Sequence, residues 1–134
     1  MLFIASGSFG VKDGMLGPIP KTLRTGSWTS QGFPFFAGTG VYRQTFELQE
    51  TPRQLFLEIL DVKGVAEVEL NHTRLGARAW KPYCYDVRNA LRPGKNELAV
   101  SVAGSLGNIL QRSYGEHWTP PREYGLTGNV IVHC

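Results

Sequence analysis

Aromatic side chains gather in three stretches of this sequence, at residues 27–36, 80–85 and 114–124. An aromatic ring can stack on the apolar C–H face of a sugar ring while neighbouring polar groups hold its hydroxyls. The candidates for such a carbohydrate site are Trp118, His117, Arg122, Glu123, Trp80, Tyr83 and Trp28. Trp118 leads this group because two prolines make its segment, HWTPPRE, a rigid loop, and loops often carry function.

Each candidate residue also has an explanation that involves no sugar, and this explanation differs between the candidates. For Trp28, Trp80 and Tyr83, the alternative is that the ring packs a loop onto the protein core. For Arg122 and Glu123, the alternative is an ordinary charged surface loop. The sequence therefore predicts a set of aromatic candidates, of which some are expected to be structural.

Carboxylates raise the question of whether this chain hydrolyses glycosides by itself. That reaction needs two carboxyl groups that face each other across the sugar, about 5–10 Å apart. Glu67 and Glu69 share one face of an alternating segment, which is typical of a solvated strand face. Glu116 and Glu123 flank the proline-rich loop and form the better pair, although such loops are common on protein surfaces. We therefore expect no catalytic residue in this chain.

Motifs for metal and nucleophilic chemistry are missing from the sequence. His72, His117 and His133 are scattered, no HExxH or paired Cys–His spacing occurs, and no GxSxG is present. The two cysteines, Cys84 and Cys134, cannot form a disulfide framework, and free thiols are favoured over a single bond between them. No metal site is assigned from the residues.

The length and charge of the chain predict one folded domain that binds neither nucleic acid nor a membrane. The chain has 134 residues, a net charge of +3 and basic residues broken up by apolar and turn residues, so we expect no nucleic-acid partner. No apolar run approaches the roughly 20 residues of a membrane-spanning helix, so we expect no membrane partner. The start, MLFIA, is too short for a signal peptide, and the apolar end, NVIVHC, suggests a piece of a longer protein. The compartment stays open, with a periplasmic or secreted parent among the alternatives.

Short alternating segments separated by Gly and Pro turns predict the elements that position these side chains. Strands are expected at residues 3–11, 41–48, 55–60, 65–70, 75–80, 96–102 and 129–132, with turns at 71–74 and 92–95. Tyr42, Phe46 and Leu48 fall on one face of their strand. A single helical turn is expected at 86–91, with Asp86 as its cap. Because no segment has a sustained helical period, the expected fold class is all-β, as an antiparallel β-sandwich or jelly roll.

Several motifs occur in an order that resembles one known family. They are Ser27-Trp28, Phe35-Phe36-Ala37-Gly38-Thr39, Tyr42-Arg43, Val65 to Asn71, Trp80-Lys81-Pro82-Tyr83, Asp86-Val87, Leu91, Gly94, Asn96, Leu98, Val100, Gly125-Leu126, Gly128 and Val130. This order resembles the sugar-binding, galactose-binding-like β-sandwich domain of glycoside hydrolase family 2 and the related domain of family 106 α-L-rhamnosidases. His72 stands where that family usually has Gly, so the turn after Asn71 is expected to differ.

The resemblance implies an N-terminal strand and connector at residues 1–22 and the sandwich domain at 23–134. It also implies a non-catalytic accessory domain whose partners are carbohydrate and the catalytic domain of the same parent, a glycoside hydrolase of rhamnosides or galactosides. Two alternatives stay open, a free-standing carbohydrate-binding or adhesion module and a structural domain without a ligand. No cofactor is expected, although such sandwiches often hold a structural Ca²⁺, for which the sequence assigns no ligands.

Overall fold

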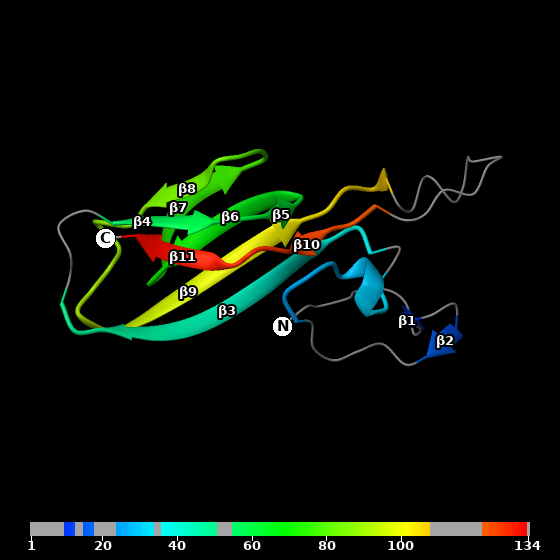
Figure 1. Cartoon of the computed structure of the whole chain (residues 1–134), viewed down its shortest axis with the longest axis horizontal. Helices are drawn as coiled ribbons and strands as arrows, with labels where there is room; N and C mark the ends of the chain where they lie inside the picture. The colour runs from blue at the N-terminus through cyan, green and yellow to red at the C-terminus, as the bar shows by residue number, and fades with distance from the viewer. Residues whose placement is uncertain are drawn as a thin grey trace.

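The computed structural model describes residues 10–12, 15–17, 24–33, 36–50, 55–107 and 122–133. Within these residues, two antiparallel sheets form a β-sandwich (Figure 1). The larger sheet has the strand order β3-β9-β6-β7 and the smaller one the order β11-β4-β8. The strands are β1 Gly10–Lys12, β2 Met15–Gly17, β3 Thr39–Leu48, β4 Phe56–Ile59, β5 Val62–Lys63, β6 Val65–Leu70, β7 Thr73–Arg78, β8 Tyr83–Asp86, β9 Gly94–Ala103, β10 Gly125–Leu126 and β11 Val130–His133. The predicted all-β sandwich is confirmed, and its jelly-roll connectivity stays a prediction.

Alternation along the strands places the core between the two sheets. On β6 the side chains of Ala66, Val68 and Leu70 are buried, as the sequence predicts. The buried residues of the smaller sheet include Leu57 and Ile59 of β4. The Tyr85 hydroxyl of β8 donates to the Ala66 carbonyl of β6 at 2.9 Å, which joins the two sheets across the core.

The hairpin between β6 and β7 is tighter than the predicted turn at 71–74. Asn71 and His72 both have a positive φ, of 50° and 65°, so the turn consists of these two residues. Thr73 already pairs with Leu70 in the ladder. His72 thus adopts the left-handed conformation that a glycine would adopt more easily.

The segment after Trp80 corrects a second expectation. The sequence predicts no strand at residues 83–86, but they form strand β8, which pairs with β4. Strand β7 ends at Arg78, so Trp80 belongs to the connection between β7 and β8 instead of to a strand. The predicted turn after β8 is confirmed as one hydrogen-bonded turn, in which Leu91 N donates to Val87 O at 2.9 Å. Arg88 N donates to Asp86 Oδ1 at 3.0 Å, as expected of a cap.

The N-terminal part contributes a small hairpin of its own, in which β1 pairs with β2. Residues 3–9 of the expected first strand lie outside the described residues. A short 3-10 helix, η1 at Thr29–Gln31, follows before β3. Pairing of Gly26 N with Leu126 O and of Trp28 N with Tyr124 O ties this region to β10. The predicted division at residues 22 and 23 stays a prediction.

Candidate functional site

Burial separates the aromatic candidates into two groups. Trp28 is fully buried and Tyr83 is 5% exposed, whereas Trp80 is 78% exposed. His117 and Trp118 lie outside the described residues, so the leading candidate stays a prediction. The burial of Trp28 and Tyr83 leaves no open ring face for a sugar, so the structural alternative accounts for their placement.

Trp28 packs the loop before β3 onto the end of the sandwich. Its ring meets Phe36 edge to face at a centroid distance of 5.5 Å and lies 6.1 Å from the ring of Tyr124. Among the described residues, its Nε1 is the buried side-chain polar atom that has no hydrogen-bond partner. Tyr124 shares a hydrogen bond with the Ser105 hydroxyl, which fixes it beneath Trp28.

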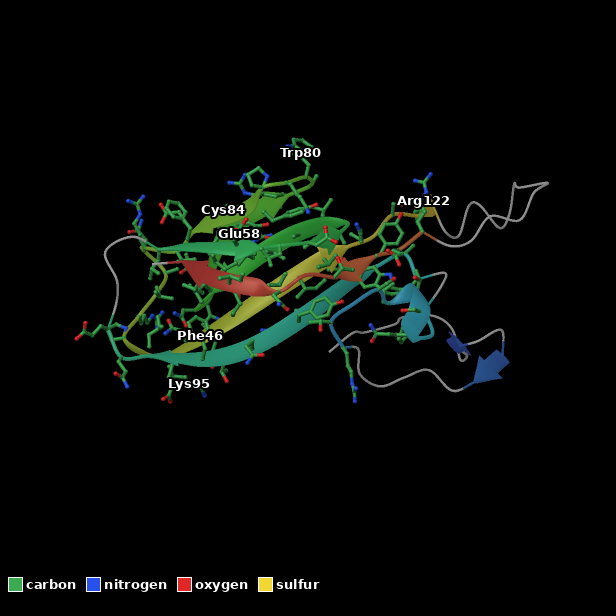
Figure 2. All side chains as sticks on the ribbon, in the orientation of Figure 1. Phe46, Glu58, Trp80, Cys84, Lys95 and Arg122 are labelled. Carbon is green, nitrogen blue, oxygen red and sulfur yellow. The ribbon has the colours of Figure 1, made fainter. Side chains whose placement is uncertain are left out.

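Trp80 projects into solvent from the connection between β7 and β8 (Figure 2). The next residue, Lys81, places its Nζ 3.3 Å from Asp61 Oδ1. Asp61 also accepts a 2.7 Å hydrogen bond from the Thr127 hydroxyl and pairs with Lys63. The Thr127 hydrogen bond and the two lysines hold the pKa of the Asp61 carboxyl below its usual value, against a smaller opposing effect of burial. The β7–β8 connection, which contacts Asp61 through Lys81, therefore presents the exposed indole of Trp80 to solvent.

The remaining described candidates, Arg122 and Glu123, are both exposed and lie just before β10. Arg122 makes further contacts in the structure. In Figure 2 it projects from the opposite end of the sandwich to Phe46. The structure thus supports access to these two side chains, and their role in a carbohydrate site stays a prediction.

Several carboxylates of the two sheets have basic neighbours close by. Glu67 pairs with Arg74 across the hairpin, and Glu69 lies 3.8 Å from His72. Asp86 pairs with Arg88, whose hydrogen bonds keep the pKa of the Asp86 carboxyl below its usual value. Glu116, half of the better predicted pair, lies outside the described residues.

The described residues contain no cluster of three or more His, Cys, Asp or Glu side chains that could hold a metal ion. Asp13, an acidic residue of a type that binds Ca²⁺, lies outside the described residues. A structural Ca²⁺ stays a prediction. Cys84 is a half-buried free thiol, and Cys134 is outside the described residues. In the part of the chain that is described, no helix is long and apolar enough to span a membrane.

One feature of the surface was missed by the sequence analysis. An open groove of about 640 Å³ is lined by residues of β3, β9, β10 and β11 and of the connections beside them, namely Thr25, Gly40, Val41, Tyr42, Arg43, Gln44, Phe46, Leu98, Val100, Leu126, Gly128, Asn129, Val130 and Val132. Strands β3 and β11 are end members of their two sheets, and residues of both strands line the groove. Its signal in the sequence was Gln44, a polar residue at an inward position of β3.

Tyr42, one of the residues that line this groove, joins β3 to β10 through its hydroxyl. It accepts a 3.3 Å hydrogen bond from Leu126 N of β10, although the two residues are 84 positions apart in the chain. Burial raises the pKa of the Tyr42 hydroxyl, and the Leu126 hydrogen bond opposes part of that change. Tyr42 therefore remains protonated at neutral pH and retains an O–H that can donate.

Comparisons with known proteins give a consistent result. The family model described as glycosyl hydrolase 2 galactose-binding domain-like matches residues 37–129. A rhamnosidase from Novosphingobium sp. PP1Y is 27% identical, with a TM-score of 0.63 over 75% of this chain and 11% of that chain. A comparison with curated proteins gave no match.

Two further solved structures share the fold. A β-glucuronidase from Bifidobacterium dentium, complexed with coumarin-3-O-glucuronide, is 21% identical, with a TM-score of 0.61 over 87% of this chain and 25% of that one. A β-D-mannosidase from Dictyoglomus thermophilum is 21% identical, with a TM-score of 0.54 over 71% of this chain and 15% of that one. This chain therefore spans between a tenth and a quarter of the length of these three structures.

Proposed function

The chain belongs to the glycosyl hydrolase 2 galactose-binding domain-like family, and from this premise we propose that it is a non-catalytic accessory domain of a glycoside hydrolase. In this proposal, the sandwich supports the architecture of the parent enzyme and its binding of carbohydrate, while a separate domain cleaves the glycosidic bond. The observation that carries the proposal is the extent of the family match, whose residues 37–129 include strands of both sheets.

The state of the carboxyl groups supports a non-catalytic role. A general acid for glycoside cleavage needs a raised pKa, so that it is still protonated near neutral pH. Asp61 and Asp86 have lowered pKa values because hydrogen bonds and basic neighbours favour their charged forms. Glu67, on the predicted strand pair, is engaged by Arg74. These groups are suited to holding loops and hairpins together.

The second candidate function is a free-standing carbohydrate-binding module, and the exposure of Trp80 favours it. A solvent-facing indole on a tethered loop is the kind of surface on which a sugar ring stacks. The same exposure also suits a contact with a neighbouring domain, because tryptophan is common at the centre of protein interfaces. Both uses are compatible with an accessory domain, so the proposal above comes first.

A hydrolysis assay on the purified 134-residue chain tests the non-catalytic role. The substrates are 4-nitrophenyl α-L-rhamnoside, β-D-galactoside, β-D-glucuronide and β-D-mannoside, of which the rhamnoside comes first because a similar structure is a rhamnosidase. We expect no release of nitrophenol above a buffer control. Turnover that copurifies with the chain and is lost in Glu67→Gln or Glu123→Gln would overturn the proposal.

A further inference from the structure

Strand β3 carries one polar residue on a face that is otherwise apolar. Tyr42, Phe46 and Leu48 are half-buried and pack against the core. Gln44 has the same inward parity on the strand and lines the groove between β3 and β11, but its side chain is exposed. No described residue forms a hydrogen bond with its side-chain amide. The groove therefore has an apolar floor with an available amide in its wall.

The amide at position 44 argues against an apolar occupant. If another strand or a second copy of this chain closed the groove with apolar side chains, the Gln44 amide would be buried without a partner. An unsatisfied buried amide costs about 1–3 kcal/mol, and an apolar residue at this position would avoid that cost. The composition of the groove instead fits a ligand with both apolar faces and hydroxyl groups.

The positions of the two rings fit the same kind of ligand. Tyr42 and Phe46 each stand two residues from Gln44, which along a strand corresponds to about 7 Å on either side. Further polar groups at the rim are those of Thr25, Arg43 and Asn129. Small-molecule sites combine an apolar lining with a few placed polar groups and usually measure about 300–1,000 Å³, a range that includes this groove at about 640 Å³.

We propose that the groove between β3 and β11 is a glycan-binding cleft, in which Tyr42 and Phe46 contact the C–H faces of sugar rings and the Gln44 amide binds a hydroxyl. The ligand class is an oligosaccharide of two or three sugars, because three inward positions of β3 that span about 14 Å line the groove. The choice of a glycan rests on the proposed function, whereas the position of the cleft rests on the groove itself. This cleft is separate from the aromatic loops that the sequence analysis selected.

Titration of the isotope-labelled chain with rhamnose, rutinose, lactose and glucuronic acid tests the cleft by NMR. We expect saturable shifts of the Gln44 side-chain amide and of backbone amides in β3 and β11 with at least one disaccharide. Gln44→Leu should raise the dissociation constant at least tenfold. Thr45→Ala, a matched change at an exposed position on the opposite face of the same strand, should leave it unchanged.

Other outcomes overturn the inference in distinguishable ways. Shifts confined to the Trp80 indole would place sugar binding on the β7–β8 connection and exclude the groove. No shift with any of the four sugars would also exclude it, and the accessory function would still stand. A dimer in analytical ultracentrifugation with protected β3 amides would identify a second copy as the occupant. Failure of the accessory function itself would appear as turnover in the nitrophenyl assay.

The melting temperature of Gln44→Leu shows whether this substitution changes the stability of the protein as well as its sugar binding. Because Gln44 has no partner among the described residues and Leu has a similar size, Gln44→Leu should melt at the wild-type temperature or above it. A lower melting temperature would show that the amide has a structural role inside the protein and would overturn its assignment to a ligand.

Discussion

The side-chain amide of Asn71 donates to the side-chain oxygen of Asn96 at 2.8 Å, between the β6–β7 hairpin and the start of β9. The same Asn71 amide donates to Ala90 O, and its oxygen accepts from Glu97 N. Asn96 in turn accepts from Arg92 N and donates to the carbonyls of Arg92 and Gly94. Asn96 is fully buried, and through these bonds the pair satisfies its own amide groups and joins the β6–β7 hairpin to Ala90 and to the chain entering β9.

Replacement of Asn96 should therefore cost far more stability than a surface change. We expect Asn96→Ala to lower the free energy of unfolding by about 2–4 kcal/mol, because the buried Asn71 amide and the partly buried Arg92 N and two carbonyls lose a partner. Urea unfolding followed by circular dichroism measures the difference. Asn89→Ala is the matched control, since Asn89 is exposed in the neighbouring turn and should change stability by less than about 0.5 kcal/mol. Equal losses in the two variants would contradict the structural role of the pair.

A glycine at position 72 should stabilise the hairpin. His72 has a φ of 65°, and a residue with a Cβ pays about 1–2 kcal/mol in this left-handed conformation. Its ring lies 3.8 Å from Glu69 and 3.9 Å from Glu97, but it is 82% exposed, so these contacts contribute little. We expect His72→Gly to raise the free energy of unfolding by about 0.5–1 kcal/mol. His72→Ala keeps the Cβ and should give no gain, so a gain in both variants would refute the conformational explanation.

Local patterns in the sequence predicted much of this fold. The alternation of β6 and β9 placed Val68, Val100 and Val102 in the core, and Asn71 marked the left-handed turn. These features depend on residues close in sequence, which is why periodicity and turn preference reveal them. The strand β8 was missed because Pro82, just before it, is typical of a loop, while its pairing with β4 depends on residues more than 20 positions away.

The candidate sites depended on contacts that no local pattern contains. Gln44 is an ordinary polar residue until β11 is placed opposite β3, and Thr127 meets Asp61 across 66 positions. Trp28 and Trp80 have similar loop contexts in the sequence, yet one is fully buried and the other is 78% exposed. Residue type alone thus selected aromatic side chains, but tertiary packing decided which of them a ligand could reach.

The two tryptophans should respond in opposite ways to truncation. Trp28→Ala should lower the free energy of unfolding by about 3–5 kcal/mol, because it leaves a large cavity beside Phe36 and Tyr124. Trp80→Ala should change it by no more than about 0.5 kcal/mol, because its indole is mostly in solvent. Thermal and urea unfolding provide both values. A large loss in Trp80→Ala would show that this indole packs against the protein and would remove it as an exposed platform.

The Asp61 contacts should make part of the stability depend on pH. The folded-state pKa of Asp61 lies below the ordinary value of 3.8. At pH values above 3.8, the charged carboxylate therefore stabilises the folded protein. This contribution should be lost as the pH falls through the lower, folded-state pKa. We expect Asp61→Asn to be less stable than the wild type at pH 7 and the gap to narrow below about pH 4. Urea unfolding between pH 2 and 7 measures the gap, and Glu50→Gln, an exposed change of equal charge, is the control. A gap that stays constant down to pH 2 would mean that the Asp61 charge contributes nothing, and that the loss comes from the altered hydrogen bond with Thr127.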